Sequence, residues 1–557
     1  MSKIWLKSYP PGVPADIDPN RLRSLKALLE SSCAAYADRV AFVQMGKSLT
    51  YRELDELSRA FGAWLQKKGF KKGDRLAIML PNTLQYPIAL LGALRAGLVV
   101  VNTNPLYTAT ELEHQLSDAG ATAIVVLENF AHVVEAVLPR TKIKHVLVTA
   151  VGDFLAFPKS AIVNFVIRRV RRQVKPWHIV GSTDLEAAIA DGRRSPLEPV
   201  ELNHEDLAFL QYTGGTTGVA KGAMLSHGNM CANVLQAEAW IGQHFADARS
   251  VLITPIPLYH IFALTANCLL FLRLGWKNVL IINPRDFPAV VAELKRHPFS
   301  FITGVNTLFN ALLHTPGFDK LDFSSLRITL GGGMAVQGTV AQRWKEVTGH
   351  ILTQAWGLTE TSPAACINPP DADFNGSIGL PISSTEVAIK DDAGKDLAIG
   401  EVGEICVRGP QVMQGYWNRP DETEKVMLPE GWLRTGDIGH MDENGFVYIE
   451  DRKKDMILVS GFNVYPNEVE AVAVTHPGVL EAAAVAQADE HSGEVVALFV
   501  VRKDPSLTER ALIDFCRKSL AGYKTPKHVY FKQELPKTNV GKILRKALRD
   551  ELATATK

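Results

Sequence analysis

Residues 212–222 read Tyr212-Thr213-Gly214-Gly215-Thr216-Thr217-Gly218-Val219-Ala220-Lys221-Gly222 and combine closely spaced glycines, threonine hydroxyls and one cation. Glycine tolerates left-handed backbone, so consecutive N–H groups can turn inward around an anion. The hydroxyls add hydrogen-bond donors, and Lys221 adds a point charge that suits a polyphosphate. Because Lys221 precedes Gly222 and no Gly-Lys-Ser/Thr ends the stretch, it is not a Walker A loop. The stretch predicts a phosphate-binding loop; taken alone, a glycine-rich hairpin turn remains the alternative.

Helical and strand-like patterns alternate on both sides of this loop. Capping-box patterns precede two expected helices, at Thr50 with Glu53 and at Thr108 with Glu111. Short apolar runs such as 75–80 and 122–127 lie between the helical patterns, and the same alternation resumes after Asp206. Near-continuous apolar strands between helices are typical of parallel sheets covered on both faces. We therefore expect an α/β fold with a large, multi-layer N-terminal domain and parallel-rich sheets.

The composition changes near residue 450. Gly436-Asp437 and Asn444-Gly445 are typical of turns, and 451–455 is a charge cluster between two strand-like runs. The residues that follow Lys453 are enough for one small α+β domain. The sequence thus predicts an N-terminal domain of residues 1–453 and a C-terminal domain of residues 454–557.

Charge and composition exclude several classes of protein. Of the 557 residues, 60 are Lys or Arg and 59 are Asp or Glu, a net charge of +1 that argues against nucleic acid as the main partner. Apolar residues make up 46% and charged residues 21%, which excludes a disordered or fibrous chain. The six cysteines include no close pair, which excludes a disulfide scaffold and suits a reducing cytosol. Because the N-terminus also lacks the apolar run of a secretory signal, we expect a large cytoplasmic enzyme.

A stretch without charged residues, 250–272, resembles a membrane span. Pro255 and Pro257 would break a spanning helix. We therefore expect a strand, a turn and a buried helix.

Residues 162–175 predict a basic amphipathic helix. Its apolar side carries Ile162, Val163, Val166, Ile167, Val170 and Val174, and its basic side carries Arg168, Arg169, Arg171, Arg172 and Lys175. Such a helix can lie in the headgroup region of an anionic membrane. A helix docked on the protein body, with its arginines in water, is the alternative, and the sequence leaves both open.

Five further motifs follow the glycine-rich loop. In chain order they are Gly331-Gly332-Gly333-Met334, Gln354-Ala355-Trp356-Gly357-Leu358-Thr359-Glu360, Gly431-Trp432-Leu433-Arg434-Thr435-Gly436-Asp437, Asp451-Arg452-Lys453-Lys454 and Asn539-Val540-Gly541-Lys542. Together they resemble the acyl-adenylate-forming (ANL) superfamily of acyl-CoA synthetases, luciferases and peptide-synthetase adenylation domains. Within it the chain is most similar to bacterial long-chain fatty acid–CoA ligases, with 257–262 and 459–466 as supporting stretches.

This resemblance implies that a carboxylate attacks the α-phosphorus of ATP to give acyl-AMP and pyrophosphate. It assigns ATP binding to Tyr212, Thr213, Gly214, Gly215, Thr216, Thr217, Gly218, Lys221, Gly222, Gly331, Gly332, Gly333, Gln354, Trp356, Gly357, Thr359, Asp437 and Arg452. Glu360, with help from Thr213, is expected to hold Mg²⁺ on the phosphates. Trp356 is expected to offer a flat ring to the adenine, and Asp437 and Arg452 to bind the ribose.

The resemblance also assigns the catalytic groups Lys542, Glu360, Lys221 and His260. Lys542 is expected to orient the carboxylate and stabilise the pentacovalent phosphorus. His260 is expected beside the carboxylate, although a histidine satisfied within the core is a competing interpretation. Phe262 and Leu264 are expected in the acyl pocket.

A second half-reaction with coenzyme A requires a different site geometry. The resemblance implies that the small C-terminal domain is mobile and swings about a hinge, for which we favour Lys454. After the rotation, the loop Ser460-Gly461-Phe462 is expected to face the pantetheine arm of coenzyme A.

Three positions depart from the family pattern. Gly214 stands where serine is frequent, Ala220 where proline is frequent, and Trp356 where tyrosine is usual. The loop loses one hydroxyl and some rigidity, and the base platform keeps its π-face but loses a phenol. None of the three removes a charged catalytic group.

The sequence favours a ligase that joins long-chain fatty acids to coenzyme A with ATP and Mg²⁺, in lipid degradation and at the inner face of the plasma membrane. A medium-chain or aryl acid ligase is the alternative within the superfamily, and luciferase-type oxygenation shares the same adenylation residues. An amino-acid-activating domain would place an aspartate near 257–260, where none occurs. A non-catalytic nucleotide-binding scaffold would lack a charged residue among Glu360, Asp437, Arg452 and Lys542, and all four are present. A homodimer is compatible with the sequence, which carries no sign of oligomeric state.

Overall fold

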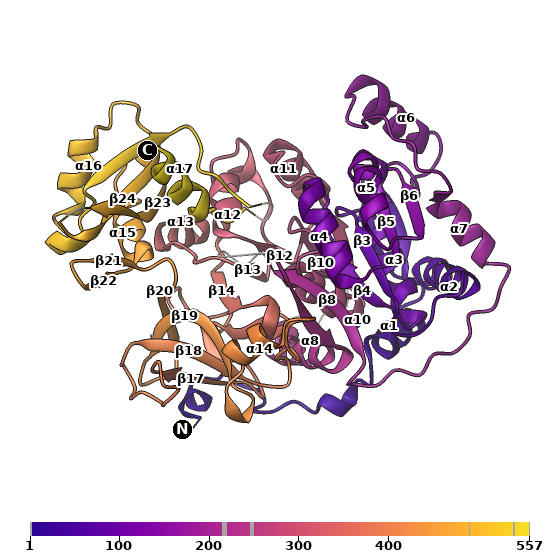
Figure 1. Cartoon of the computed structure of the whole chain (residues 1–557), viewed down its shortest axis with the longest axis horizontal. Helices are drawn as coiled ribbons and strands as arrows, with labels where there is room; N and C mark the ends of the chain where they lie inside the picture. Colours follow the sequence, from indigo (N-terminus) through magenta and orange to yellow (C-terminus); the bar gives the residue numbers. More distant parts are fainter. Residues whose placement is uncertain (1–2, 214–219, 245–249, 490, 539–540, 556–557) are drawn as a thin grey trace.

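The computed structural model describes residues 3–213, 220–244, 250–489, 491–538 and 541–555. Within them, the chain forms two large parallel-rich sheets, a smaller antiparallel sheet and a C-terminal α+β unit (Figure 1). The expected α/β class with a separate C-terminal part is confirmed.

The first large sheet has seven strands and is built as the apolar runs predicted. Their order is β7 (Thr183–Asp184), β6 (His145–Thr149), β5 (Ala123–Leu127), β3 (Arg75–Met79), β4 (Val99–Asn102), β8 (Leu207–Thr213) and β9 (Lys221–Ser226). Strand β3 pairs in parallel with β4 and β5, and β9 closes one edge antiparallel to β8.

Helices cover both faces of this sheet. Leu76 and Ile78 of β3 lie in one apolar cluster with residues of α2 (Tyr51–Lys67) and α3 (Gln85–Arg95). Ala77 and Met79 lie in another with α4 (Ala109–Ala119) and α5 (Ala131–Val137). Neighbouring side chains in a strand point to opposite faces, so both sides of each strand must be apolar. The capping boxes expected at Thr50 and Thr108 begin α2 and α4.

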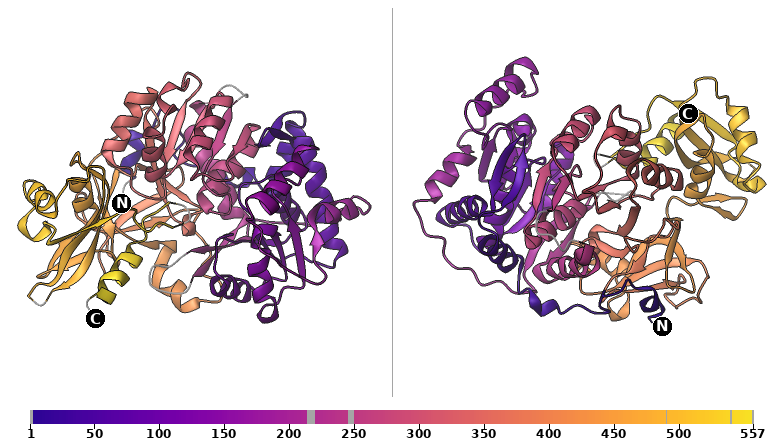
Figure 2. Two further views of the ribbon diagram at one scale, coloured as in Figure 1. Left: turned by 90° about the horizontal axis from the view of Figure 1, so that it is seen from above. Right: turned by 180° about the vertical axis from the view of Figure 1, so that it is seen from behind.

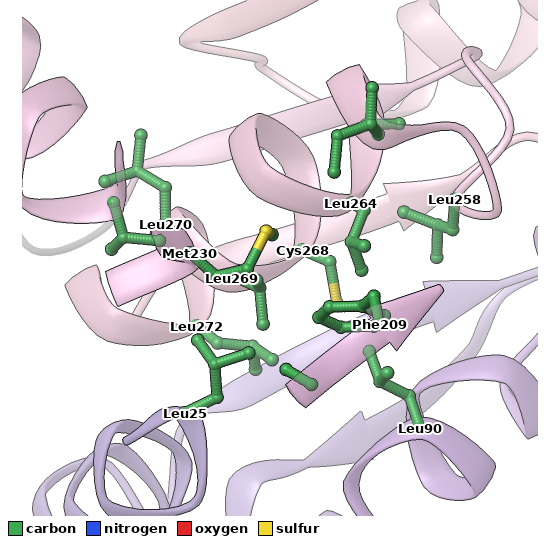
Figure 3. Close-up of a cluster of buried hydrophobic side chains, with 14 of the residues drawn as sticks. Leu25, Leu90, Phe209, Met230, Leu258, Leu264, Cys268, Leu269, Leu270 and Leu272 are labelled. Atoms are coloured by element: carbon green, nitrogen blue, oxygen red, sulfur yellow. The ribbon is translucent and has the colours of Figure 1, made fainter. Parts of the chain in front are cut away.

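The second large sheet has nine strands. Their order is β16 (Leu380–Pro381), β15 (Ala364–Ile367), β14 (Leu352–Gly357), β13 (Ile328–Gly331), β12 (Phe301–Gly304), β10 (Val251–Thr254), β11 (Lys277–Leu280), β1 (Val40–Gln44) and β2 (Lys47–Thr50). One face packs against α11 (Phe287–Arg296), α12 (Asn306–Leu313) and α13 (Gly338–Thr348). The other packs against α8 (His227–Ile241) and α10 (Leu270–Leu274), which also contact the first sheet through Phe209 of β8 (Figure 3).

The uncharged stretch 250–272 has the structure that its prolines predicted. It forms β10, a turn, the short helix α9 (Ile261–Ala263), a π-helical stretch (Leu264–Leu269) and the start of α10. Its apolar side chains lie in the core between the two large sheets. In the described part of the chain, every helix is too short or too polar to cross a bilayer.

The basic amphipathic helix is shorter than expected. It begins as α6 (Lys159–Phe165), continues as a π-helical stretch (Val166–Val170) and ends there instead of reaching residue 175. Arg171 and Gln173 donate backbone N–H groups to the carbonyls of Val166 and Ile167, while Arg172 takes a positive φ of 49°. Such a left-handed residue ends a helix, and this end could not be predicted because glycine, not arginine, usually fills that position. Figure 1 shows α6 at the margin of the molecule, beyond α5 and β6.

The C-terminal third begins with a four-stranded antiparallel sheet of β17 (Glu386–Lys390), β18 (Gly403–Arg408), β19 (Leu433–Met441) and β20 (Val447–Arg452). The prediction of a turn at Gly436-Asp437 is wrong, because both residues lie inside β19. The pairing register between β18 and β19 shifts next to Gly436. The sheet that follows comprises β22 (Phe462–Val464), β21 (Ile457–Val459), β24 (Gly493–Arg502), β23 (Val479–Asp489) and β25 (His528–Lys532).

The last sheet carries its own apolar core. One face packs against α15 (Pro466–Ala473) and α16 (Glu509–Cys516), and the other against α17 (Arg545–Ala555). This unit lies beside α12 and α13 at one end of the molecule, as the views in Figures 1 and 2 agree. The segment between β20 and β21 is its covalent link to the rest of the chain, where the sequence predicts the domain boundary.

Candidate active site

A cavity of about 310 Å³ lies where the two large sheets, the antiparallel sheet and the C-terminal unit meet. Its polar wall includes Thr213, Lys221, His260, Gly332, Gly333, Trp356, Gly357, Thr359, Glu360, Thr435, Arg452, Lys454 and Lys542. Its apolar wall includes Ala237, Ile241, Phe262, Ala266, Leu270, Phe301, Leu330 and Ile367. Residues from six of the sequence motifs therefore surround one space, which is lined by cations, a carboxylate and hydrocarbon side chains.

Glu360 is the cavity carboxylate with the donor chemistry for magnesium. It is nearly buried in the turn after β14, and the Tyr416 hydroxyl donates a hydrogen bond of 2.7 Å to its Oε1. Thr213 adds a hydroxyl oxygen on the same cavity wall. Mg²⁺ prefers hard oxygen ligands and usually takes one or two carboxylates together with substrate phosphates. The pair fits that requirement; no cluster of three or more His, Cys, Asp or Glu side chains that could hold a metal occurs among the described residues.

Asp437 lies behind the cavity wall and is held by two neighbours. The indole N–H of Trp356 donates to its Oδ2 at 2.9 Å, and the guanidinium of Arg452 lies 2.5 Å from its Oδ1. Burial raises the pKa of Asp437 above its usual value, although the Arg452 charge and the Trp356 hydrogen bond oppose that shift. The tryptophan that replaces the usual tyrosine thus gains a contact that the sequence did not predict.

Lys542 reaches the cavity from the C-terminal unit. Burial, followed by the nearby Arg452 charge, lowers the pKa of Lys542 to about 8. His260 shares the cavity wall, and its Nδ1 accepts the backbone N–H of Phe262 at 3.3 Å. Burial and the Lys542 charge lower the pKa of His260 to about 3, so this imidazole is neutral at physiological pH.

Lys221 carries an ion pair that no motif indicated. Its Nζ contacts Oε2 of Glu422, which lies on α14 (Pro420–Val426), and sits 5.0 Å from the centre of the Tyr416 ring. The second oxygen of Glu422 accepts a hydrogen bond of 2.6 Å from Lys425. The charge on Lys221 is therefore already engaged.

Some predicted residues do not form the cavity wall. Gly214, Gly215, Thr216, Thr217 and Gly218 lie outside the described residues. The structure describes four others that do not line the cavity, namely Tyr212, Gly222, Gly331 and Gln354. The Tyr212 hydroxyl donates to Asp118 at 2.6 Å, and the Gln354 side-chain oxygen accepts the backbone N–H of Val336 at 3.0 Å, so these two contacts support neighbouring segments.

Leu264, expected in the acyl pocket, does not line this cavity. It is fully buried in the core between the two large sheets (Figure 3), whereas Phe262, Thr265 and Ala266 line the cavity. Residues three or four apart share one face of a helix, so Phe262 shares its face with Thr265 and Ala266, while Leu264 points elsewhere.

The loop Ser460-Gly461-Phe462 lies away from the cavity in this arrangement. Ser460 and Gly461 take positive φ values of 49° and 85° in the turn between β21 and β22, and Phe462 is exposed beside Tyr523. Among the described residues, Lys542 therefore lines the cavity, whereas Ser460, Gly461 and Phe462 do not.

The sequence did not indicate that Tyr416 contacts Glu360 or that Glu422 contacts Lys221. Tyr416 is 56 residues from Glu360, and Glu422 is 201 residues from Lys221. Neither lies in one of the quoted motifs. Only the fold brings them to the site.

Comparison with known proteins identifies the family of this chain. The model described as "AMP-binding enzyme" matches residues 29–417, and that described as "AMP-binding enzyme C-terminal domain" matches residues 468–542. The chain belongs to the AMP-binding enzyme family. Full-length relatives of this AMP-binding enzyme include the long-chain-fatty-acid–CoA ligase of Escherichia coli O157:H7, which is 57% identical over 99% of this chain and 98% of that protein. The long-chain-fatty-acid–CoA ligase of Bacillus subtilis (strain 168) is 38% identical over 99% of this chain and 98% of its own length.

Solved structures agree with this assignment. The AMP-binding enzyme resembles the fold of an anthranilate CoA ligase in complex with anthranoyl-AMP, with a TM-score of 0.85, 24% identity, and coverage of 97% of this chain and all of that one. It also resembles a benzoate CoA ligase from Burkholderia xenovorans LB400, with a TM-score of 0.82, 26% identity, and coverage of 95% of this chain and all of that one.

Proposed function

We propose that this AMP-binding enzyme uses ATP to join long-chain fatty acids to coenzyme A through an acyl-AMP intermediate, releasing pyrophosphate and AMP. The observation that carries the proposal is the single cavity whose polar wall suits a triphosphate and whose apolar wall suits a hydrocarbon chain. The full-length relatives named as long-chain-fatty-acid–CoA ligases support the choice of acid.

In the first half-reaction, one carboxylate oxygen of the fatty acid attacks the α-phosphorus and pyrophosphate leaves. Negative charge then accumulates on the attacking oxygen, the phosphorus and the leaving group, so cations must be in place beforehand. Lys542 holds the carboxylate and the α-phosphate, and Lys221 binds the β- and γ-phosphates. Asp437, held by Arg452 and Trp356, accepts hydrogen bonds from the ribose hydroxyls. Glu360 and Thr213 would hold Mg²⁺, which would neutralise charge on the phosphates.

In the second half-reaction, the thiol of coenzyme A attacks the acyl-AMP carbonyl and AMP leaves. Lys542 now fills the side of the cavity that faces the C-terminal unit, while Ser460-Gly461-Phe462 lies elsewhere on that unit. A rotation about Lys454, on the linking segment, would withdraw Lys542 and present this loop instead. Lys454 lies on this segment with its side chain exposed and also lines the cavity, so a change of its backbone torsions would move the C-terminal unit relative to the cavity.

The choice of acid can be tested by pyrophosphate release across fatty acids of graded chain length, with and without coenzyme A. We expect long chains to give the highest kcat/KM, because the apolar wall from Phe262 to Ile241 gains contact with each added methylene. Higher kcat/KM for aryl or medium-chain acids would overturn the long-chain assignment and leave the adenylating activity intact.

We further propose that the margin around α6 contacts an anionic membrane at the inner face of the plasma membrane. Val163 and Ile167 pack against the protein body, and Arg168 pairs with Glu128, so part of the helix is docked. Three other apolar side chains of this segment, Ile162, Phe165 and Val170, are 57%, 61% and 65% exposed. Exposed apolar residues beside arginines match the way amphipathic helices bind anionic lipid, and the substrate itself partitions into lipid.

Charge reversal of Arg169 and Arg171 together is expected to weaken binding to phosphatidylglycerol-containing vesicles in a flotation assay. The matched control reverses Arg193 and Arg194, which are exposed after α7 (Leu185–Gly192). An equal loss of vesicle binding in both variants would mean that only the net charge of the protein matters. Unchanged vesicle binding in the α6 variant would contradict the proposal that this surface contacts the membrane.

A further inference from the structure

We propose that Glu422 competes with the substrate triphosphate and with product pyrophosphate for Lys221, and thereby lowers the affinity of the enzyme for both. This inference rests on the proposed ATP chemistry at the same cavity. It adds to that chemistry Glu422, which is negatively charged like the phosphates whose binding it weakens.

The geometry places Glu422 next to the phosphate-binding lysine but outside the cavity wall. Lys221 lines the cavity together with Thr213 and Glu360, and Glu422 approaches its ammonium from α14. The Lys221 and Glu422 side chains are 27% and 33% exposed, so water screens the pair only in part. The Lys221 ammonium also lies over the ring of Tyr416, whose hydroxyl bonds to Glu360. The Lys221 ammonium is thus already engaged by Glu422 and by the Tyr416 ring.

The charge on Glu422 persists across the physiological pH range. Hydrogen bonds from Lys221 and Lys425 lower the pKa of Glu422 to about 2. A phosphate oxygen in contact with Lys221 would lie within roughly 6 Å of the Glu422 carboxylate, because each partner sits about 3 Å from the same ammonium. Like charges at that separation repel each other. A polyphosphate that binds Lys221 must therefore weaken the Lys221–Glu422 ion pair, or bind against repulsion from Glu422, or both, and each lowers its affinity.

The effect is confined to ligands that carry phosphates beyond the α position. AMP lacks the β- and γ-phosphates and therefore does not compete for Lys221. Pyrophosphate does compete for Lys221. As pyrophosphate leaves, the Glu422 carboxylate pairs with Lys221 again, which would favour release of the product. A cleft of about 400 Å³ adjoins the cavity and shares Glu360 and Tyr416 with it. Lys425, the second partner of Glu422, lines that cleft.

The test is direct titration of full-length protein with ATP, pyrophosphate and AMP, each with Mg²⁺ and without fatty acid, by isothermal calorimetry. We expect Glu422→Gln to lower the Kd for ATP and for pyrophosphate about two- to fivefold, the range typical of an exposed ion pair, and to leave the Kd for AMP unchanged. The matched control is Asp421→Asn, which removes the same charge from the neighbouring exposed residue of α14 and is expected to change none of the three.

An unchanged or higher Kd for ATP in a folded Glu422→Gln variant would overturn the inference, because Glu422 would then be neutral or supportive toward the triphosphate. Equal tightening by Asp421→Asn would reduce the effect to net charge and overturn it as well. If wild-type protein fails to bind ATP at all, it is the proposed function that fails, and the two failures are therefore distinguishable.

Discussion

Replacing Trp356 with phenylalanine keeps an aromatic face toward the cavity but removes the N–H group that donates to Asp437 Oδ2 at 2.9 Å. A hydrogen bond to a charged group typically contributes about 1.5–3 kcal/mol, and the carboxylate that loses its donor here is nearly buried. At about 1.4 kcal/mol per factor of ten, that range corresponds to roughly 10- to 150-fold. Because Arg452 still holds Oδ1, we expect the lower end, about a tenfold higher KM for ATP.

The assay is pyrophosphate release with ATP and with 2′,3′-dideoxy-ATP. If Trp356 acts through Asp437 on the ribose hydroxyls, Trp356→Phe raises KM for ATP and leaves KM for the dideoxy analogue, which has no hydroxyls to bind, unchanged. The control Trp344→Phe also removes a buried indole hydrogen bond, of 3.1 Å to Thr329, but outside the cavity wall, and should leave both KM values unchanged. An equal penalty for both nucleotides in Trp356→Phe would refute the reasoning, since the loss would then lie in ring packing.

Three further predictions concern the two half-reactions. Lys542→Ala should reduce acyl-AMP formation by at least about a hundredfold, the size expected for loss of a preorganised charge contact, and largely spare thioester formation from supplied acyl-AMP; equal loss of both steps in a folded variant would contradict this division. Lys454→Pro should retain adenylation and block transfer to coenzyme A, whereas undiminished thioester output would remove Lys454 as the hinge. Because Lys542 has a pKa lowered to about 8, it loses its charge as pH rises, so kcat/KM for adenylation should fall above about pH 8. Lys542→Arg stays charged and should abolish that fall, even at lower activity; a fall that persists in this variant would assign it to another group, such as Lys454.

Local signals in the sequence account well for the regular elements. The capping boxes at Thr50 and Thr108 begin helices because the side chain and the backbone partner lie three residues apart, a distance that a sequence displays directly. The apolar strand runs predicted parallel sheets with two covered faces, and both large sheets have them. The ordered motifs likewise indicated which segments share the cavity.

Contacts between distant segments could not be predicted in the same way. The bond between Trp356 and Asp437 joins residues 81 apart, and the indole ring of Trp356 was expected only as a platform for the base. Leu264 was misplaced because the choice between cavity and core depends on which way a helix is rotated. Asp437 was expected in a turn because glycine before aspartate is typical of turns, whereas sheet pairing places both inside β19.

The most direct measurement is a single-turnover experiment with enzyme, ATP, Mg²⁺ and a long-chain fatty acid in the absence of coenzyme A. The cavity described above should release pyrophosphate in proportion to enzyme and retain acyl-AMP, which is converted to thioester when coenzyme A is added. Absence of pyrophosphate from folded enzyme that binds both substrates, or pyrophosphate release without acyl-AMP, would contradict the claim that one cavity activates the acid at the α-phosphorus.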